Sequence, residues 1–155
     1  MKAVKITKHG QPVAVQEVKK PEPGPNDALI KVEACGICRS DWHAWQGDFT
    51  WIGISPELPI TPGHEFGGVI EQLGANVQSF EVGDRVTAPF HWACGHCEYC
   101  KKGETNLCLN IQVYGMAEGL EGAYAEYILV PNAEVNLIKL PENVDSVTAA
   151  AAGCR

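Results

Sequence analysis

Four of the seven cysteines in this sequence are crowded into one short stretch. Cys94, Cys97 and Cys100 stand three residues apart, and Cys108 follows after seven intervening residues. Thiolates at this spacing can surround one tetrahedral zinc ion without straining the chain, and four protein ligands close its coordination shell. The pattern therefore predicts a structural zinc site in a lobe of about residues 91–110.

Two other uses of these four cysteines are open, namely a pair of disulfides and an iron–sulfur cluster. The number of cysteines is odd and the N-terminus lacks a signal peptide, which predicts a reducing, cytoplasmic compartment where clustered thiols bind metal more often than they pair. Iron–sulfur runs resemble the spacing only loosely, since no proline follows Cys108. Zinc is the favoured interpretation.

A second set of candidate ligands is spread along the chain as Cys38, His64 and Cys154. Each is weak evidence by itself, because most lone cysteines and histidines have structural roles. Cys38 follows an expected strand, however, and His64 lies in a turn bracketed by glycines that lets the backbone approach closely. A catalytic zinc takes three protein ligands and keeps one position exchangeable, and Asp41 and Glu65 supply carboxylates that can orient an imidazole ligand. The set predicts an open metal site.

The elements that would position these residues are mostly short strands separated by glycine and proline. Capping residues predict two short helices. Ser40 or Asp41 would cap a helix near residues 40–45, and a second helix is expected to begin after Asp145. Strands are expected at Lys2–Ile6, Val13–Val18, Ala28–Ala34, Gly68–Leu73, Arg85–Ala88, Tyr124–Val130 and Val135–Leu140.

Composition narrows the function classes. The chain has 155 residues, 45% of them hydrophobic, which suits one folded domain. Its net charge of −7 and the lack of a basic stripe argue against a nucleic-acid partner. No apolar run approaches the roughly 18–20 residues of a membrane span, so no membrane partner is expected.

Several motifs resemble, in the same order, those of the zinc-containing alcohol dehydrogenases of the medium-chain dehydrogenase/reductase superfamily. They are Cys35–Asp41, Gly63–Glu65 with Gly68, Gly74 and Val77 at fixed offsets, the cysteine quartet, Val82–Val86 and Gly153–Cys154. The resemblance implies a mainly β fold with few short helices. It would be a GroES-like, partly open barrel with a zinc-binding lobe, forming a catalytic domain over residues 1–155.

The same resemblance implies roles for the site residues. Cys38, His64 and Cys154 would hold a catalytic zinc and the quartet a structural zinc, giving two zinc ions per chain. Ser40 would hydrogen-bond the substrate oxygen and pass its proton towards His43. By the same resemblance Asp41 would be the partner of the histidine ligand, and Arg39 would contact the pyrophosphate of NAD or NADP. Phe90 and Trp45 would line the substrate pocket, and plain core packing is the alternative for both.

The implied reaction is the reversible oxidation of small alcohols to aldehydes or ketones, with hydride transfer to NAD(P). Family members that act on polyols commonly have glutamate at the position of Cys154, so this cysteine favours simple primary or secondary alcohols. No Gly-x-Gly-x-x-Gly fingerprint opens a helix, so the doubly wound nucleotide-binding domain is expected outside this sequence. The chain is expected to be part of a longer homo-oligomeric enzyme and to be inactive alone.

Two functions of other classes are also open. One is a non-enzymatic zinc-binding module, and the other is a thiol or zinc redox sensor that uses the quartet. A binding module has no need of Ser40 and His43 beside an open metal site, which favours the enzyme.

Overall fold

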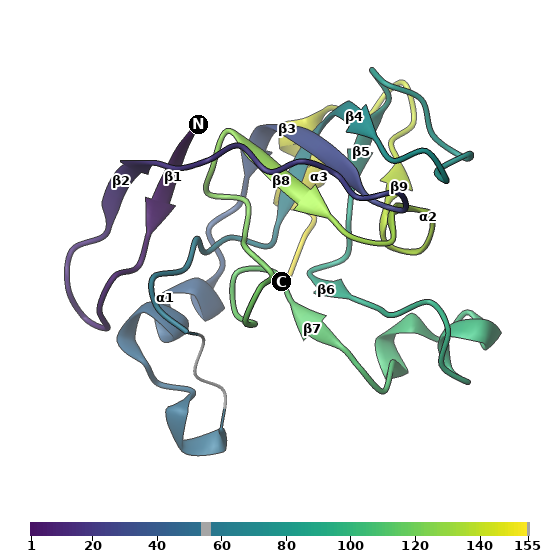
Figure 1. The fold of residues 1–155 in the computed structure, drawn as a ribbon. Coiled ribbons are helices and arrows are strands. Elements are labelled where there is room, and N and C mark those ends of the chain that lie inside the picture. Colours follow the sequence, from purple (N-terminus) through teal and green to yellow (C-terminus); the bar gives the residue numbers. More distant parts are fainter. Residues whose placement is uncertain (54–56, 155) are drawn as a thin grey trace.

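The protein, described here by a computed structural model, is built around one antiparallel sheet (Figure 1). The structure describes residues 1–53 and 57–154. The sheet has five strands in the order β8-β3-β4-β5-β9, and the pairs β1-β2 and β6-β7 form two smaller sheets. The strands are β1 (Lys2–Lys5), β2 (Ala14–Glu17), β3 (Ala28–Cys35), β4 (Phe66–Leu73), β5 (Arg85–Thr87), β6 (His91–Trp92), β7 (Gln112–Val113), β8 (Tyr127–Val130) and β9 (Ile138–Lys139).

The helices are few and short, as expected from the sequence. They are the α-helices α1 (Arg39–Gln46), α2 (Ala133–Asn136) and α3 (Ser146–Ala151), and the 3-10 turns η1 (Thr50–Ile52), η2 (Cys100–Lys102) and η3 (Thr105–Leu107). None of the helices in the described residues is long and apolar enough to cross a membrane.

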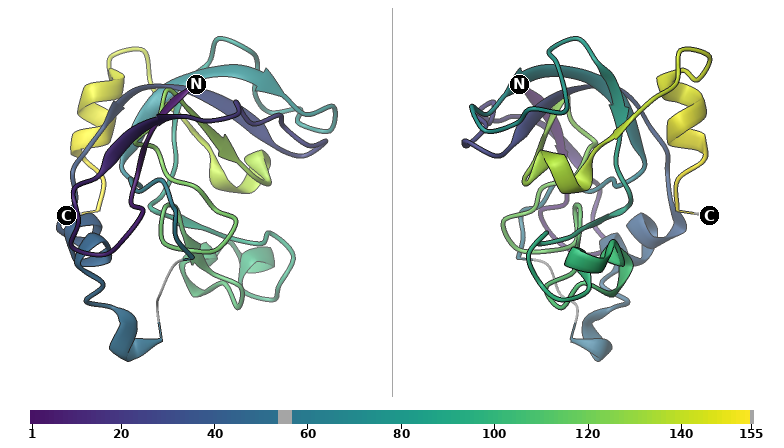
Figure 2. Two further views of the ribbon diagram at one scale, coloured as in Figure 1. Left: turned by 60° about the vertical axis from the view of Figure 1, so that its left-hand side comes forward. Right: turned by 90° about the vertical axis from the view of Figure 1, so that its right-hand side faces the viewer.

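The sheet curves into a partly open barrel because the N-terminal strand joins it through the segment before β8. The Val4 N–H donates to the carbonyl of Tyr124 (2.8 Å), and the Val32 N–H donates to that of Glu126 (3.0 Å). This segment thus lies between β1 and β3, and Figure 2 shows the resulting curvature. The inner face buries an apolar core that includes Ile30, Phe66, Ile70, Val86, Tyr114 and Ile128.

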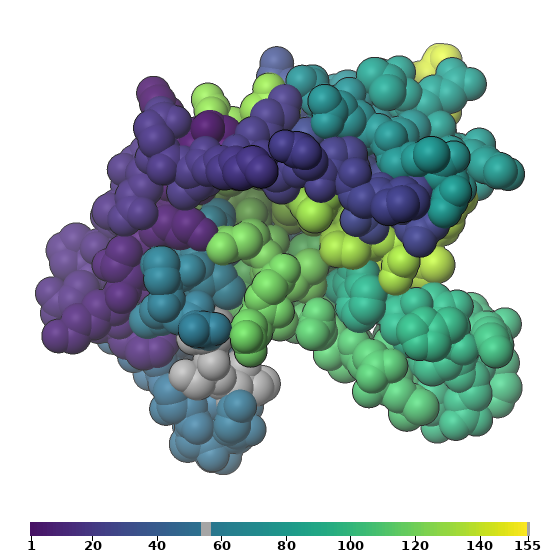
Figure 3. All heavy atoms as spheres, in the orientation of Figure 1, coloured from purple at the N-terminus to yellow at the C-terminus, as the bar shows by residue number. Residues whose placement is uncertain are grey.

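The cysteine lobe has a core of its own. Ala93, Cys94 and Cys108 are buried together, with Trp92, Cys97 and Cys100 packed against them. Figure 3 shows the lobe, coloured teal to green, protruding from the body of the molecule. The sequence-based prediction of a mainly β fold with a few short helices and a four-cysteine lobe is confirmed.

Two local predictions are wrong. The strand expected over Val135–Leu140 is a short helix, α2, followed by the two residues of β9. The helix expected to be capped by Ser40 or Asp41 begins earlier, with Cys38 as its N-cap residue. The Asp41 carboxylate accepts from the Cys38 N–H (3.1 Å), so Asp41 stabilises this helix start from inside the first turn.

Candidate metal centres

The first candidate centre forms where three separate elements meet. Because β3 and β4 are antiparallel, the end of β3 at Cys35 pairs with the start of β4 at Phe66. Cys38 then follows β3 at the start of α1, and His64 lies two residues before the first residue of β4. Helix α3 packs on β3, β4 and β5 outside the barrel, which brings Cys154 to the same place (Figure 2).

These three residues are close enough to share one ion. The Cys38 and Cys154 sulfurs and a ring nitrogen of His64 all lie within 4.8 Å of one another. Two thiols and an imidazole are the donor set that zinc prefers, and three ligands leave a position for substrate. The residues therefore fit the metal that the sequence predicts.

The Ser40 hydroxyl bridges two of the three candidate ligands. Its Oγ donates to Cys38 Sγ at 3.0 Å and lies 3.1 Å from Nε2 of His64. A single hydroxyl thus lies within hydrogen-bonding distance of two of the three candidate ligands. This placement agrees with the predicted contact between Ser40 and the substrate, which stays a prediction.

The Asp41 carboxylate is buried beneath His64, with 6% of the residue exposed. Its Oδ1 accepts from the Gly63 N–H at 3.0 Å and lies 3.3 Å from Nδ1 of His64. Its Oδ2 accepts from the Cys38 N–H at 3.1 Å and from the Tyr124 hydroxyl at 2.8 Å. The side chain faces the ring nitrogen opposite to the one that faces Ser40, which suits the predicted orienting role.

The electrostatics of this centre favour the charged forms of His64, Asp41 and Cys38 despite their burial. Burial disfavours the imidazolium of His64, but the nearby Asp41 carboxylate outweighs this effect and raises the His64 pKa. Burial likewise opposes ionisation of Asp41 and Cys38, yet their hydrogen-bond partners lower both pKa values. Burial, reinforced by Cys38, raises the pKa of Cys154.

Glu65 is placed directly behind the centre. The residue is 2% exposed, and neither of its carboxylate oxygens has a hydrogen-bond partner among the described residues. Gly36 and Gly153 pack against it so closely that a Cβ on either would approach Glu65 side-chain atoms to 2.3 Å and 2.7 Å. The two glycines therefore make room for a buried carboxylate beside the candidate ligands.

The other predicted site residues lie on the open side or farther away. Phe90, 42% exposed, borders the site with its ring centroid 6.5 Å from that of His64. Arg39 is exposed at the start of α1. His43 hydrogen-bonds Asp48 at 2.8 Å, and within the described residues no hydrogen bond joins it to Ser40.

Trp45 points elsewhere, because its indole N–H donates to the carbonyl of Gln11 in the N-terminal segment. The contact favours the packing alternative over a place in the substrate pocket for this residue.

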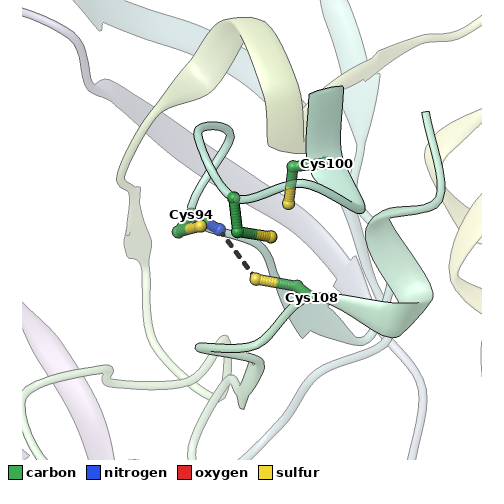
Figure 4. Close-up of side chains that lie close together, drawn as sticks. Cys94, Cys100 and Cys108 are labelled. Carbon is green, nitrogen blue, oxygen red and sulfur yellow. Dashed lines mark hydrogen bonds between the residues drawn. The ribbon is translucent and has the colours of Figure 1, made fainter. Parts of the chain in front are cut away.

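The second candidate centre is the cysteine quartet. One sulfur from each of Cys94, Cys97, Cys100 and Cys108 lies within 4.8 Å of the others. Figure 4 shows the Cys94, Cys100 and Cys108 side chains directed towards a common centre. The Cys94 N–H also donates to Cys108 Sγ at 3.3 Å.

The quartet thiols are not equivalent. The backbone N–H of His96 leads the contacts that lower the pKa of Cys94 to about 6. Burial raises the pKa of Cys100 to about 12, with the neighbouring Cys97 adding to the effect. A single cation among the four would stabilise every thiolate at once, which is how a metal replaces protons in such a site.

Sequence reasoning missed Tyr124, whose hydroxyl reaches Asp41. In the sequence this tyrosine is one of several aromatic residues in an expected strand. Its role depends on the pairing of its segment with β1, which places it over the loop at Gly63, so the sequence carries no signal for it.

Comparison with known proteins agrees with this geometry. The family described as "Alcohol dehydrogenase GroES-like domain" matches residues 24–142. The chain belongs to this family. Its fold is accordingly a GroES-like domain of the zinc-containing, medium-chain alcohol dehydrogenase type.

The most similar relatives include alcohol dehydrogenases and L-threonine 3-dehydrogenases. An alcohol dehydrogenase of Geobacillus stearothermophilus is 40% identical over 155 residues, which are 99% of this chain and 44% of the relative. An L-threonine 3-dehydrogenase of Deinococcus radiodurans is 37% identical over 150 residues, or 97% of this chain and 42% of the relative. The chain thus spans less than half the length of the curated relatives it matches.

Solved structures show the same GroES-like domain. The alcohol dehydrogenase TADH from Thermus sp. ATN1 superposes with a TM-score of 0.84 at 42% identity, covering 94% of this chain and 42% of that one. A putative zinc-binding dehydrogenase from Sinorhizobium meliloti 1021, solved bound to NADP, gives a TM-score of 0.78 at 39% identity, covering 96% and 41%.

Proposed function

We propose that this chain is the catalytic domain of a zinc-dependent dehydrogenase that interconverts alcohols with aldehydes or ketones and uses NAD or NADP. The observation that carries the proposal is the meeting of Cys38, His64 and Cys154, with their ligand atoms within 4.8 Å, around the Ser40 hydroxyl. The cysteine quartet is the proposed structural zinc site. The names of the relatives, alcohol and L-threonine 3-dehydrogenases, support the reaction class.

The proposed roles follow from where the side chains lie. A zinc ion held by the three ligands would act as a Lewis acid and lower the pKa of a substrate hydroxyl. Ser40 would accept that hydroxyl's proton, because its Oγ already stands beside both Cys38 and His64. Asp41 would hold the imidazole ring, and Glu65 would place negative charge behind the centre.

The remaining roles are proposed on the family resemblance. His43 would carry the proton from Ser40 to solvent, since an imidazole can both accept and donate a proton. Arg39, exposed at the start of α1, would contact the cofactor pyrophosphate. The nicotinamide would be held by a separate doubly wound domain, and the complete enzyme would be a homo-oligomer.

The substrate class is a small molecule with a primary or secondary hydroxyl. Cys154 as third ligand favours simple alcohols, and Phe90 offers an apolar wall near His64. Relatives named L-threonine 3-dehydrogenase make a hydroxyl on an amino acid the second candidate. A panel of simple alcohols and L-threonine, tested on the complete enzyme, separates the two.

Zinc content of the purified chain, measured by elemental analysis after gel filtration under reducing conditions, tests the proposal. We expect two zinc ions per chain, and one in each of Cys38→Ser and Cys97→Ser. Cys35→Ser is the matched control, because Cys35 is outside both clusters, and it should keep two. Zinc content that Cys38→Ser leaves unchanged would contradict the proposed catalytic centre.

A further inference from the structure

Tyr124 connects the loop of His64 with the start of α1. Its ring covers Gly63, where a Cβ would lie 2.6 Å from the ring atom Cδ1. Its hydroxyl lies 2.8 Å from Oδ2 of Asp41 and 3.0 Å from the carbonyl oxygen of Gly36. The hydroxyl has one proton to donate, and a carboxylate is the stronger of these two acceptors.

The donors around Asp41 are shared evenly between its two oxygens. Oδ1 faces the Gly63 N–H and Nδ1 of His64, whereas Oδ2 accepts from the Cys38 N–H and the Tyr124 hydroxyl. Two of the four contacts come from backbone groups that are fixed by the fold. Tyr124 is therefore the one side chain other than His64 that contacts this carboxylate through a polar group in the described residues.

We propose that Tyr124 is a positioning residue for the metal centre: it fixes the rotation of the Asp41 carboxylate, which in turn holds the ring of His64 in the orientation in which Nε2 faces Ser40. The inference rests on the proposed function, because it needs zinc at Cys38, His64 and Cys154. Partners behind metal-bound histidines fix ring orientation, and their loss typically weakens metal affinity by roughly 10-fold to 100-fold.

The chain offers a matched control in Tyr114. This tyrosine is fully buried, and its hydroxyl has no hydrogen-bond partner among the described residues. Tyr114→Phe and Tyr124→Phe each remove one hydroxyl and leave an aromatic ring. Only the second removes a contact with Asp41.

The test follows zinc transfer from the loaded, purified chain to a chromogenic chelator such as 4-(2-pyridylazo)resorcinol. We expect zinc to be released in two kinetic phases, one from each centre. The phase that Cys38→Ser abolishes belongs to the three-residue centre, and the phase of the quartet is the internal reference. We expect Tyr124→Phe to speed the first phase by about 10-fold or more and to leave the quartet phase unchanged. Tyr114→Phe should leave both phases at the wild-type rate.

A second measurement separates positioning from general loosening. If Tyr124 acts through Asp41, the double variant Asp41→Asn/Tyr124→Phe should release zinc no faster than Asp41→Asn alone. A cobalt-loaded Tyr124→Phe chain should also show shifted d–d absorption, since the imidazole ligand is reoriented.

The outcomes are distinct. If the Cys38-dependent phase is unchanged in Tyr124→Phe, this inference alone is overturned. It is also overturned if both centres release zinc faster and the Tm falls, because that result indicates a purely structural tyrosine. A wild-type chain without any Cys38-dependent phase overturns the proposed function and this inference with it.

Discussion

At the scale of single residues, Gly63 decides how His64 approaches its partners. Its φ of +100° is a conformation that side chains strongly disfavour, and a Cβ would collide with the ring and the backbone nitrogen of Tyr124. Its N–H donates to Asp41. The glycine therefore allows the backbone next to the candidate ligand His64 to lie against Asp41 and Tyr124.

Gly63→Ala should accordingly be more harmful than backbone strain alone explains. Gly83 is the matched control, because its φ is +96° but nothing lies within 4 Å of its Cβ position. We expect Gly83→Ala to lower the free energy of unfolding by about 1–3 kcal/mol, the usual cost of such strain. Gly63→Ala should cost clearly more, and urea unfolding measures both. Equal losses for the two variants would show that the contact with Tyr124 is unimportant.

At the scale of elements, the sequence predicts strands and helices that local patterns mark, and it misses those that tertiary contacts determine. Alternation identified β3 and β4, and the Asp145 cap identified α3. Alternation failed at Val135–Leu140 because Asn136 is drawn into the interior, where its side chain accepts from the Ala93 N–H (2.8 Å) and donates to the Ala93 carbonyl (3.0 Å). These two hydrogen bonds connect the lobe with the barrel. The Asn136 side chain makes them from the helical turn α2 and not from a strand.

Helix α3 positions the third candidate ligand, so its N-cap should affect one metal centre and spare the other. The Asp145 carboxylate accepts from the Thr148 N–H at 2.7 Å, and this bond lowers the Asp145 pKa, so the cap is ionised at neutral pH. Asp145→Ala should loosen α3 and lower the zinc affinity of the centre containing Cys154, with the quartet unchanged. Asp145→Asn, which keeps a capping oxygen, is the control and should behave like the wild type. Chelator titration resolves the two centres, and equal weakening of both would contradict the argument.

At the scale of the whole molecule, the two candidate centres depend on different parts of the fold. The spacing of the quartet made that cluster predictable, because its four ligands are local in sequence. The members of the other centre are up to 116 residues apart, and family resemblance rather than spacing brought them together in the prediction. The pairing of β3 with β4 and the packing of α3 explain physically why these three residues meet. Tyr124 reaches the site through the contact of its segment with β1, and no sequence pattern indicates that contact.

This division predicts that zinc removal unfolds the lobe and leaves the barrel intact. The lobe core consists of Ala93 and the four cysteines with Trp92, whereas the barrel core is a larger apolar cluster that shares only Trp92 with it among the described residues. Without the cation, the buried thiols lose the interaction that favours their charged form, and so small a core cannot keep the lobe folded.

Hydrogen exchange should therefore increase after chelation at residues 91–113 and stay slow in β3, β4 and β8. Cys97→Ser should reproduce this pattern without chelator, and Cys35→Ser should not. Loss of protection across the sheet as well would show that the metal site and the barrel fold as one unit.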